Sequence, residues 1–136
     1  MIKFINTLFI FFIKLLPKSF VNIFASQYVA GENIEAVLNV VSKLNKQGYK
    51  TTIDILGEHF SDTSRINEIV SEYSKLYEQI NKRNLDANLS IKPTHIGLDV
   101  SYVDALLNFT SILNLAKKYN NFLRIDMESS SATDDT

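Results

Sequence analysis

Ionisable side chains recur near the ends of three short, largely apolar segments of this chain. They are Asp54 and Glu58 in TTIDILGE, Lys92 in LSIKPT, and Asp126 and Glu128 in FLRIDME. A lysine held among carboxylates is suited to bind an anion, because the carboxylates balance its charge until a substrate carboxylate arrives. Burying unpaired charge costs several kcal/mol, so the grouping favours a binding or catalytic site. A buried ion-pair network that only fills the interior stays open, and the pattern does not identify a reaction.

Each of the three segments is expected to be a β-strand, over residues 51–58, 89–94 and 122–128. Side chains alternate between the two faces of a strand, which puts the isoleucines, leucines and methionine on one face and the charged residues on the other. Parallel sheets covered by helices on both faces have nearly continuous apolar strands instead. A barrel with helices outside and a polar ligand inside explains the alternation better, and barrel enzymes place their working groups at the C-terminal ends of the strands.

Helical patterns alternate with these strands. Residues 31–48 carry apolar side chains at helical spacing and end at Gly48, and Ser61 to Ser64 offer N-caps for a second helix. A third helix is predicted to begin at Asp99 or Ser101. One βα unit thus recurs about every 35 residues, whereas a complete barrel takes roughly 250 residues. The predicted fold class is α/β, with the first three βα units of a (β/α)8 TIM-type barrel. The barrel is expected to be incomplete, as a truncated sequence or a fragment.

The first 30 residues are predicted to form an N-terminal helical arm, and residues 31–136 the barrel portion. Residues 2–16 predict a helix with a wide apolar side. It is shorter than the ~20 apolar residues of a transmembrane helix, and no clear cleavage site of a signal peptide follows it. The arm is expected to dock on the domain. Peripheral contact of residues 1–16 with a membrane surface stays open as the alternative.

The composition excludes several classes of protein. Hydrophobic residues make up 46% and charged residues 21% of the chain, which is typical of a globular domain. The net charge is −1, so no basic excess indicates a nucleic-acid partner. The chain has no cysteine, which excludes disulfides and thiolate metal sites, and its two histidines are too scattered to predict a metal centre.

Four motifs, in order and in spacing, resemble the opening motifs of proline dehydrogenase. They are YVAGE from Tyr28, DILGE from Asp54, SIKPTHIGLD from Ser90 and RIDMES from Arg124, and the resemblance extends from about Leu16 to the end of the chain. It implies a (β/α)8 barrel that binds FAD and oxidises L-proline to Δ1-pyrroline-5-carboxylate. It also implies that the electrons pass to a membrane quinone or to another acceptor.

The resemblance also implies roles for single residues. Lys92 matches the lysine that binds the carboxylate of proline, and Asp126 matches an aspartate of the active site, close to flavin and substrate. Met127 matches the position whose backbone approaches the flavin. Glu58 matches a glutamate that pairs with a substrate-binding arginine and helps to close the site, and Asp54 matches the supporting acid of the same motif. No metal ligand is implied.

The sequence departs from the family pattern at three positions. Pro93 stands where leucine is usual, His95 replaces a common glutamine, and Ser129 replaces the second acid of a DMED pattern. The substrate-binding arginines and most FAD contacts of the family belong to later barrel units. The 136-residue chain is therefore expected not to oxidise proline by itself.

Two other interpretations stay open. The chain is a non-catalytic remnant or interaction piece of a flavin-linked barrel protein, or it belongs to another flavin-linked barrel oxidoreductase, such as a methylenetetrahydrofolate reductase-like protein, which shares the fold but not the four motifs. The resemblance implies a cytoplasmic protein, or a mitochondrial one in a eukaryote, with peripheral membrane contact through the arm as an option. Oligomeric state is left open.

Overall fold

The computed structural model describes residues 29–129 and 132–133. The chain divides into two compact units, residues 1–37 and 38–136, and each is considered by itself. The predicted arm lies outside the described residues except for its last two. Its docking, its contact with a membrane and the predicted domain limits therefore stay predictions. Among the described helices, none is long and apolar enough to cross a membrane.

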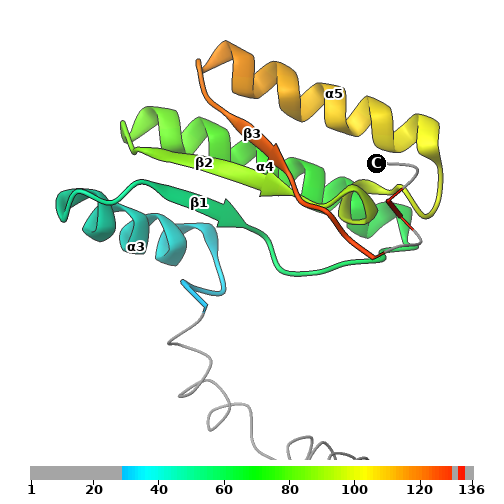
Figure 1. Ribbon diagram of the computed structural model, residues 1–136, viewed down its shortest axis with the longest axis horizontal. Coiled ribbons are helices and arrows are strands. Elements are labelled where there is room, and N and C mark those ends of the chain that lie inside the picture. The colour runs from blue at the N-terminus through cyan, green and yellow to red at the C-terminus, as the bar shows by residue number, and fades with distance from the viewer. Residues whose placement is uncertain (1–28, 130–131, 134–136) are drawn as a thin grey trace, which may run out of the picture. The chain divides into compact units, whose positions relative to one another are not determined.

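Helices and parallel strands alternate along the described chain (Figure 1). The elements are α3 (Ile34–Lys46), β1 (Thr51–Asp54), α4 (Thr63–Lys82), β2 (Ala87–Ile91), the 3-10 helix η1 (Pro93–Ile96), α5 (Tyr102–Lys118) and β3 (Leu123–Ile125). The strands pair in parallel in the order β1-β2-β3. Each strand lies beside the next along the chain, as in a (β/α)8 barrel, whereas a doubly wound sheet reverses its strand order. The predicted α/β class is confirmed.

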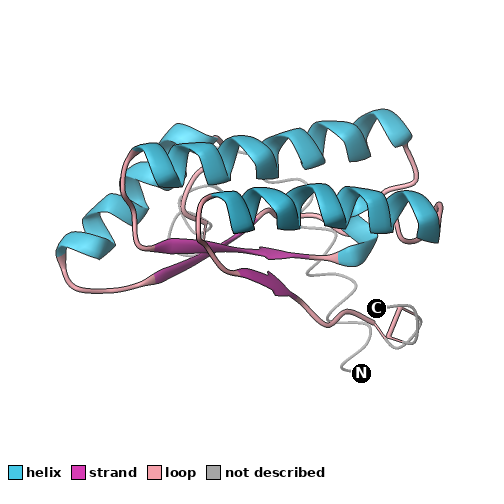
Figure 2. Cartoon of the chain, turned by 90° about the horizontal axis from the view of Figure 1, so that it is seen from above, coloured by secondary structure: helices cyan, strands magenta, loops and turns pink. Residues whose placement is uncertain are grey.

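The two long helices cover the apolar face of the sheet. Figure 2 shows α4 and α5 on the same side of the three strands. The central strand β2 is covered most completely, with Leu89 and Ile91 at 0% exposure. The inner side of α4 is buried at Ile66, Ile69, Tyr73, Leu76, Tyr77 and Ile80, at the predicted helical spacing. This packing leaves the polar side chains of the strands on the opposite face.

Side-chain caps determine where the two long helices begin. Asp62 Oδ1 accepts a hydrogen bond from the backbone N–H of Ser64 at 2.9 Å, at the start of α4. Ser101 Oγ accepts one from the backbone N–H of Asp104 at 3.2 Å, at the start of α5. Each cap satisfies an amide that the first turn of a helix leaves without a partner. Both predicted starts are confirmed, with Ser101 as the cap of α5.

The strands are shorter than predicted. β2 ends because Pro93 has no N–H to donate to a neighbouring strand, and it begins η1 instead. After β1, Gly57 has a φ of +137°, which an extended strand does not contain. The continuation of the strands to Glu58, Thr94 and Glu128 was therefore a wrong prediction. All three residues lie in the segments that leave the C-terminal ends of the strands.

The outer edge at α5 and β3 also differs from the prediction. Ile125 and Met127 were assigned to the apolar face, yet they are 43% and 68% exposed. Among the described strands β3 pairs with β2 alone, so its other side has no neighbour. α5 buries small residues and one isoleucine, Ala105, Ile112 and Ala116. Its larger residues at this edge are exposed: Val103, Leu106 and Leu107.

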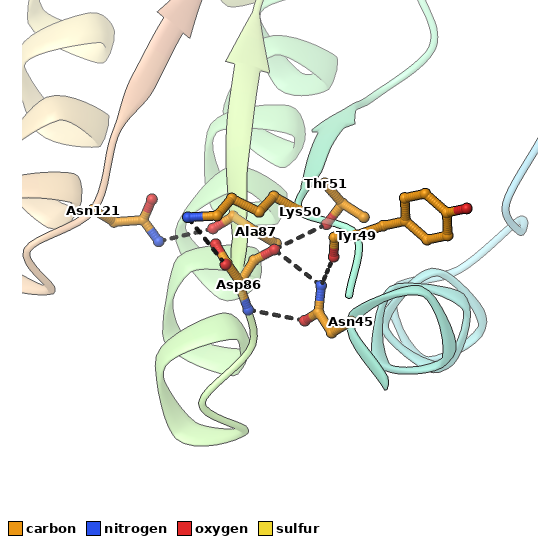
Figure 3. Close-up of polar contacts among 7 residues, drawn as sticks. All are labelled: Asn45, Tyr49, Lys50, Thr51, Asp86, Ala87 and Asn121. Carbon is orange, nitrogen blue, oxygen red and sulfur yellow. Dashed lines mark hydrogen bonds and ion pairs between the residues drawn. The ribbon is translucent and has the colours of Figure 1, made fainter. Parts of the chain in front are cut away.

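A side-chain clamp joins α3 to the start of the sheet (Figure 3). Asn45 Nδ2 donates to the backbone oxygens of Tyr49 at 2.8 Å and Asp86 at 3.1 Å. Asn45 Oδ1 accepts from the backbone N–H of Asp86 at 2.9 Å. Asn121 Nδ2 donates to the backbone oxygen of Ala87 at 3.0 Å, from the turn before β3. The clamp therefore ties α3 and the turn before β3 to the start of β2.

We expect Asn45→Ala to lower the free energy of unfolding by about 1.5–2 kcal/mol, because it removes three exposed hydrogen bonds, each near the lower end of the usual range of about 0.5–1.5 kcal/mol. Urea unfolding followed by circular dichroism measures the change. Lys50→Ala is the control, since its ion pair with Asp86 is long and exposed at 3.5 Å. Equal losses in the two variants would contradict a clamp centred on Asn45.

Candidate functional site at the C-terminal ends of the strands

Strand register places the predicted site residues on one face of the sheet. Ser90 in β2 is the register partner of Asp54 in β1 and of Arg124 in β3. Because side chains on a strand alternate with a period of two, Lys92 and Asp126 follow Ser90 and Arg124 on this same face. The face is opposite to the one on which Ile53 and Leu89 are buried.

Lys92 and Asp54 form an ion pair at this edge. Lys92 Nζ donates to Asp54 Oδ2 at 2.6 Å, and the two side chains are 13% and 33% exposed. Charge-assisted hydrogen bonds of this length are among the stronger polar contacts in proteins. The ammonium group has two further N–H donors, so it can bind a substrate anion while Asp54 keeps it in place. This contact pairs the lysine with an acid across β1 and β2, and its role toward a substrate stays a prediction.

Asp126 is held by β2 through two hydrogen bonds. Its backbone N–H donates to the backbone oxygen of Ile91 at 2.9 Å. Its carboxylate oxygen Oδ1 accepts a short hydrogen bond from Ser90 Oγ, and Ser90 is 3% exposed. The second carboxylate oxygen is the one that a ligand on this face would meet. The sequence placed Ser90 on the polar face but did not assign it this contact, since serine is common in strands and gives no specific signal.

Glu58 and Met127 take part in neither the Lys92–Asp54 ion pair nor the Ser90–Asp126 hydrogen bond. Glu58 is exposed in the loop after β1, and the Met127 side chain is 68% exposed in the segment after β3. Their sequence neighbours are hydrogen-bonded: His59 N–H donates to Thr94 Oγ1 at 3.1 Å, and Glu128 Oε2 accepts from Thr94 N–H at 2.9 Å. The sequence predicted that both residues lie at this edge, and it did not predict the contacts at Thr94.

His95 fills the core behind the loop after β1. It is 0% exposed, and its ring stacks on Phe60 with ring centroids 4.8 Å apart. The Tyr73 hydroxyl lies 3.3 Å from His95 Nδ1. Burial lowers the pKa of His95, with a contribution from the nearby Lys92 charge, and burial raises the pKa of Tyr73 above its usual range. His95 is therefore neutral at physiological pH and part of the packing.

Gly57 is required by this packing. A Cβ at Gly57 would lie 2.8 Å from His95 Nε2 and 2.9 Å from Phe60 Cζ, and the φ of +137° is one that other residues rarely adopt. The loop after β1 thus passes directly over the His95 ring. His95 therefore supports that loop from the core side.

Pro93 shapes the backbone at Lys92. A residue before proline is restricted to extended conformations, and Lys92 has φ −105° and ψ 126°. The carbonyl oxygen of Pro93 accepts from the backbone N–H of Leu98 at 3.1 Å. The proline therefore ends β2 and at the same time stiffens the backbone that carries the lysine. At Ser129 the chain turns, since the Ser129 oxygen accepts from the backbone N–H of Ala132 at 3.0 Å.

Comparison with known proteins identifies the family. The family model "Proline dehydrogenase" matches residues 37–136. Proline dehydrogenase 1 of Bacillus subtilis subsp. natto is 40% identical over 104 residues, which cover 76% of this chain and 34% of the relative. Proline dehydrogenase of Deinococcus radiodurans is 31% identical over 115 residues, which cover 82% of this chain and 37% of the relative.

A solved structure is similar in fold. It is the proline utilization A protein (PutA) from Bdellovibrio bacteriovorus inactivated by N-propargylglycine, with a TM-score of 0.70 and 21% sequence identity. The match covers 79% of this chain and 14% of that chain. The chain spans about a third of the length of the curated relatives it matches. With the family model matching residues 37–136, the chain belongs to the proline dehydrogenase family, whose members are FAD-dependent.

Proposed function

We propose that this chain supplies the substrate-facing ends of three strands of a proline dehydrogenase that oxidises L-proline to Δ1-pyrroline-5-carboxylate. The observation that carries the proposal is the Lys92–Asp54 pair, 2.6 Å long with side chains 13% and 33% exposed, at the C-terminal edge of a parallel sheet. A carboxylate is a substrate group that an ammonium group in this position can bind by charge-assisted hydrogen bonds. Family membership supports proline as the substrate.

Lys92 binds the carboxylate of proline in this proposal. Its side chain is 13% exposed, so little water competes with an incoming anion. Asp54 stays paired with Lys92 and holds the ammonium group at the strand end. Glu58 lies in the exposed loop after β1, and in this proposal it helps to close the site over the bound substrate.

Asp126 orients the amine of proline. Ser90 occupies one carboxylate oxygen of Asp126, which leaves the other free to accept a hydrogen bond from the substrate amine. Hydride leaves the carbon next to nitrogen most readily when the amine is neutral. A fixed carboxylate can hold that amine in a single orientation and accept the proton that the amine releases.

The donors at this edge fit an FAD. The carbonyl and ring-nitrogen acceptors of a flavin need N–H donors, and this edge offers the backbone of the segment after β3 at Met127. Met127 has its side chain 68% exposed and directed away from the core. When bound, FAD would accept the hydride of proline and pass two electrons to an acceptor, for which we propose a quinone.

A hybrid enzyme tests the proposal. Residues 37–136 replace the matching segment of proline dehydrogenase 1 of Bacillus subtilis subsp. natto. We expect the hybrid to bind FAD and to reduce a dye with L-proline, while residues 1–136 alone do not. A hybrid that folds, retains flavin and leaves proline unoxidised would contradict the proposal.

The exposed apolar residues of α5 support a second candidate, an interaction piece of a flavin-linked barrel protein. Val103 and Leu107 are 64% and 63% exposed, and β3 has a strand edge that another strand can pair with. The hybrid separates the two candidates. Proline oxidation by the hybrid supports the enzyme, and a folded but inactive hybrid supports the interaction piece.

A further inference from the structure

Thr94 joins the segments that leave all three strands. It follows β2 at the start of η1 and is 0% exposed. Its hydroxyl accepts the backbone N–H of His59, from the loop after β1, at 3.1 Å. The same hydroxyl donates to Glu128 Oε1, from the segment after β3, and the backbone N–H of Thr94 donates to Glu128 Oε2 at 2.9 Å. Figure 1 shows both segments running to the same side of the sheet.

The two hydroxyl contacts depend on each other. A threonine hydroxyl has one proton and two lone pairs. When the carboxylate of Glu128 takes the proton, the lone pairs of Oγ1 are turned toward other donors, and the N–H of His59 is the donor present. Consecutive hydrogen bonds of this kind polarise and strengthen one another. Loss of Glu128 is therefore expected to weaken the hydrogen bond between the His59 N–H and Thr94 Oγ1, although Glu128 itself does not accept from that N–H.

The backbone at His59 needs such support. His59 has a φ of +55°, in the left-handed region that residues other than glycine occupy at a cost of about 1 kcal/mol. Its ring adds a second link, since Nδ1 lies 2.7 Å from Asp99 Oδ2, in the segment after η1. The hydrogen bond to Asp99 raises the pKa of His59. The loop that carries Glu58 is thus attached to two places in the chain.

We propose that Thr94 is a positioning residue that couples the loop after β1 to the segment after β3. Glu58 precedes His59 and Met127 precedes Glu128, so the coupling links the two segments that carry these predicted site residues. The inference rests on the proposed function in one respect, that Glu58 closes the site over proline and Met127 approaches the flavin. The hydrogen bonds through which Thr94 acts belong to the chain itself.

Amide hydrogen exchange on the 136-residue chain tests the coupling directly. We expect Thr94→Val to raise the exchange rate of the His59 amide by about tenfold, and Glu128→Ala to raise it by a smaller factor of about two or more. Thr94→Ser keeps the hydroxyl and is expected to stay within about twofold of the parent. Thr110→Val is the matched control, since Thr110 Oγ1 donates to the backbone oxygen of Leu106 at 2.7 Å, far along α5.

Glu128→Gln is the second variant, in case the larger truncation unfolds the chain. It keeps the size of the side chain but removes the charge that holds the proton of Thr94, and we expect faster exchange at the His59 amide here too. If Glu128 acts only within the segment after β3, the exchange rate of the His59 amide stays unchanged in both Glu128 variants. Unchanged exchange at His59 in both Glu128 variants overturns the coupling.

Kinetics of the hybrid enzyme test whether the coupling through Thr94 affects substrate and flavin binding. We expect Thr94→Val to raise the KM for proline by about tenfold and to lower the retained flavin, with Thr94→Ser restoring both. If the parent hybrid oxidises proline and Thr94→Val leaves KM and flavin content within about twofold, Thr94 does not position the site. An inactive parent hybrid counts against the proposed function, and exchange at His59 then decides the coupling by itself.

Discussion

Replacing Lys92 with alanine is expected to raise the KM for proline about a hundredfold in the hybrid enzyme, with FAD still bound. Loss of a charged hydrogen-bond partner for a carboxylate costs about 1.5–3 kcal/mol, and 1.4 kcal/mol corresponds to a factor of ten. The upper part of this range applies, because the Lys92 side chain is only 13% exposed and little water can replace it. Asp54 is then left without its ion-pair partner and repels the incoming carboxylate.

Steady-state kinetics of Lys92→Ala in the hybrid enzyme measure the KM for proline, and absorbance measures the flavin content. Lys50→Ala is a matched control, since Lys50 forms its ion pair with Asp86 at the opposite, N-terminal ends of the strands. We expect its KM to equal that of the parent. A KM for Lys92→Ala within about twofold of the parent, less than ~0.5 kcal/mol, would show that Lys92 does not bind the carboxylate.

Replacing Asp126 with alanine is expected to act on the chemical step instead, with a loss in kcat of about a hundredfold or more. The carboxylate is attached to β2 by the Ser90 hydroxyl and by its own backbone N–H to the oxygen of Ile91. A group held this firmly can fix the orientation of the substrate amine. Without it, proline still binds through Lys92, but the amine samples several orientations.

The split between kcat and KM distinguishes the two residues. We expect Asp126→Ala to lower kcat with a smaller change in KM and to weaken flavin retention, since Asp126 adjoins Met127 in the chain. Asp126→Asn keeps the size and one acceptor oxygen, so its loss is expected to be smaller. Equal kcat in the parent and in Asp126→Ala, measured at saturating proline and full flavin content, contradicts the assignment.

The stretch from Leu89 to Thr94, which contains the end of β2, shows where prediction from the sequence succeeds. The alternation of Leu89, Ser90, Ile91 and Lys92 predicted a strand with one apolar and one polar face, and the structure buries Leu89 and Ile91 while Lys92 pairs with Asp54. Such alternation is a local property of a pleated backbone and needs no knowledge of the rest of the fold. The same segment shows the limit, because the predicted strand continues through Pro93, where the structure begins η1.

By itself, the sequence determined the order of the long helices and strands, the short stretches in which α4 and α5 begin, the shared face of Asp54, Lys92 and Asp126, and the family. These follow from periodicity, from single-residue preferences and from motifs, all of which are read along the chain. Only the tertiary structure decided that His95 is a core residue and that Thr94 joins two distant segments. His59 and Glu128 lie 35 and 34 positions from Thr94. Contacts at that separation exist only once strand pairing has brought the three strand ends to one edge of the sheet.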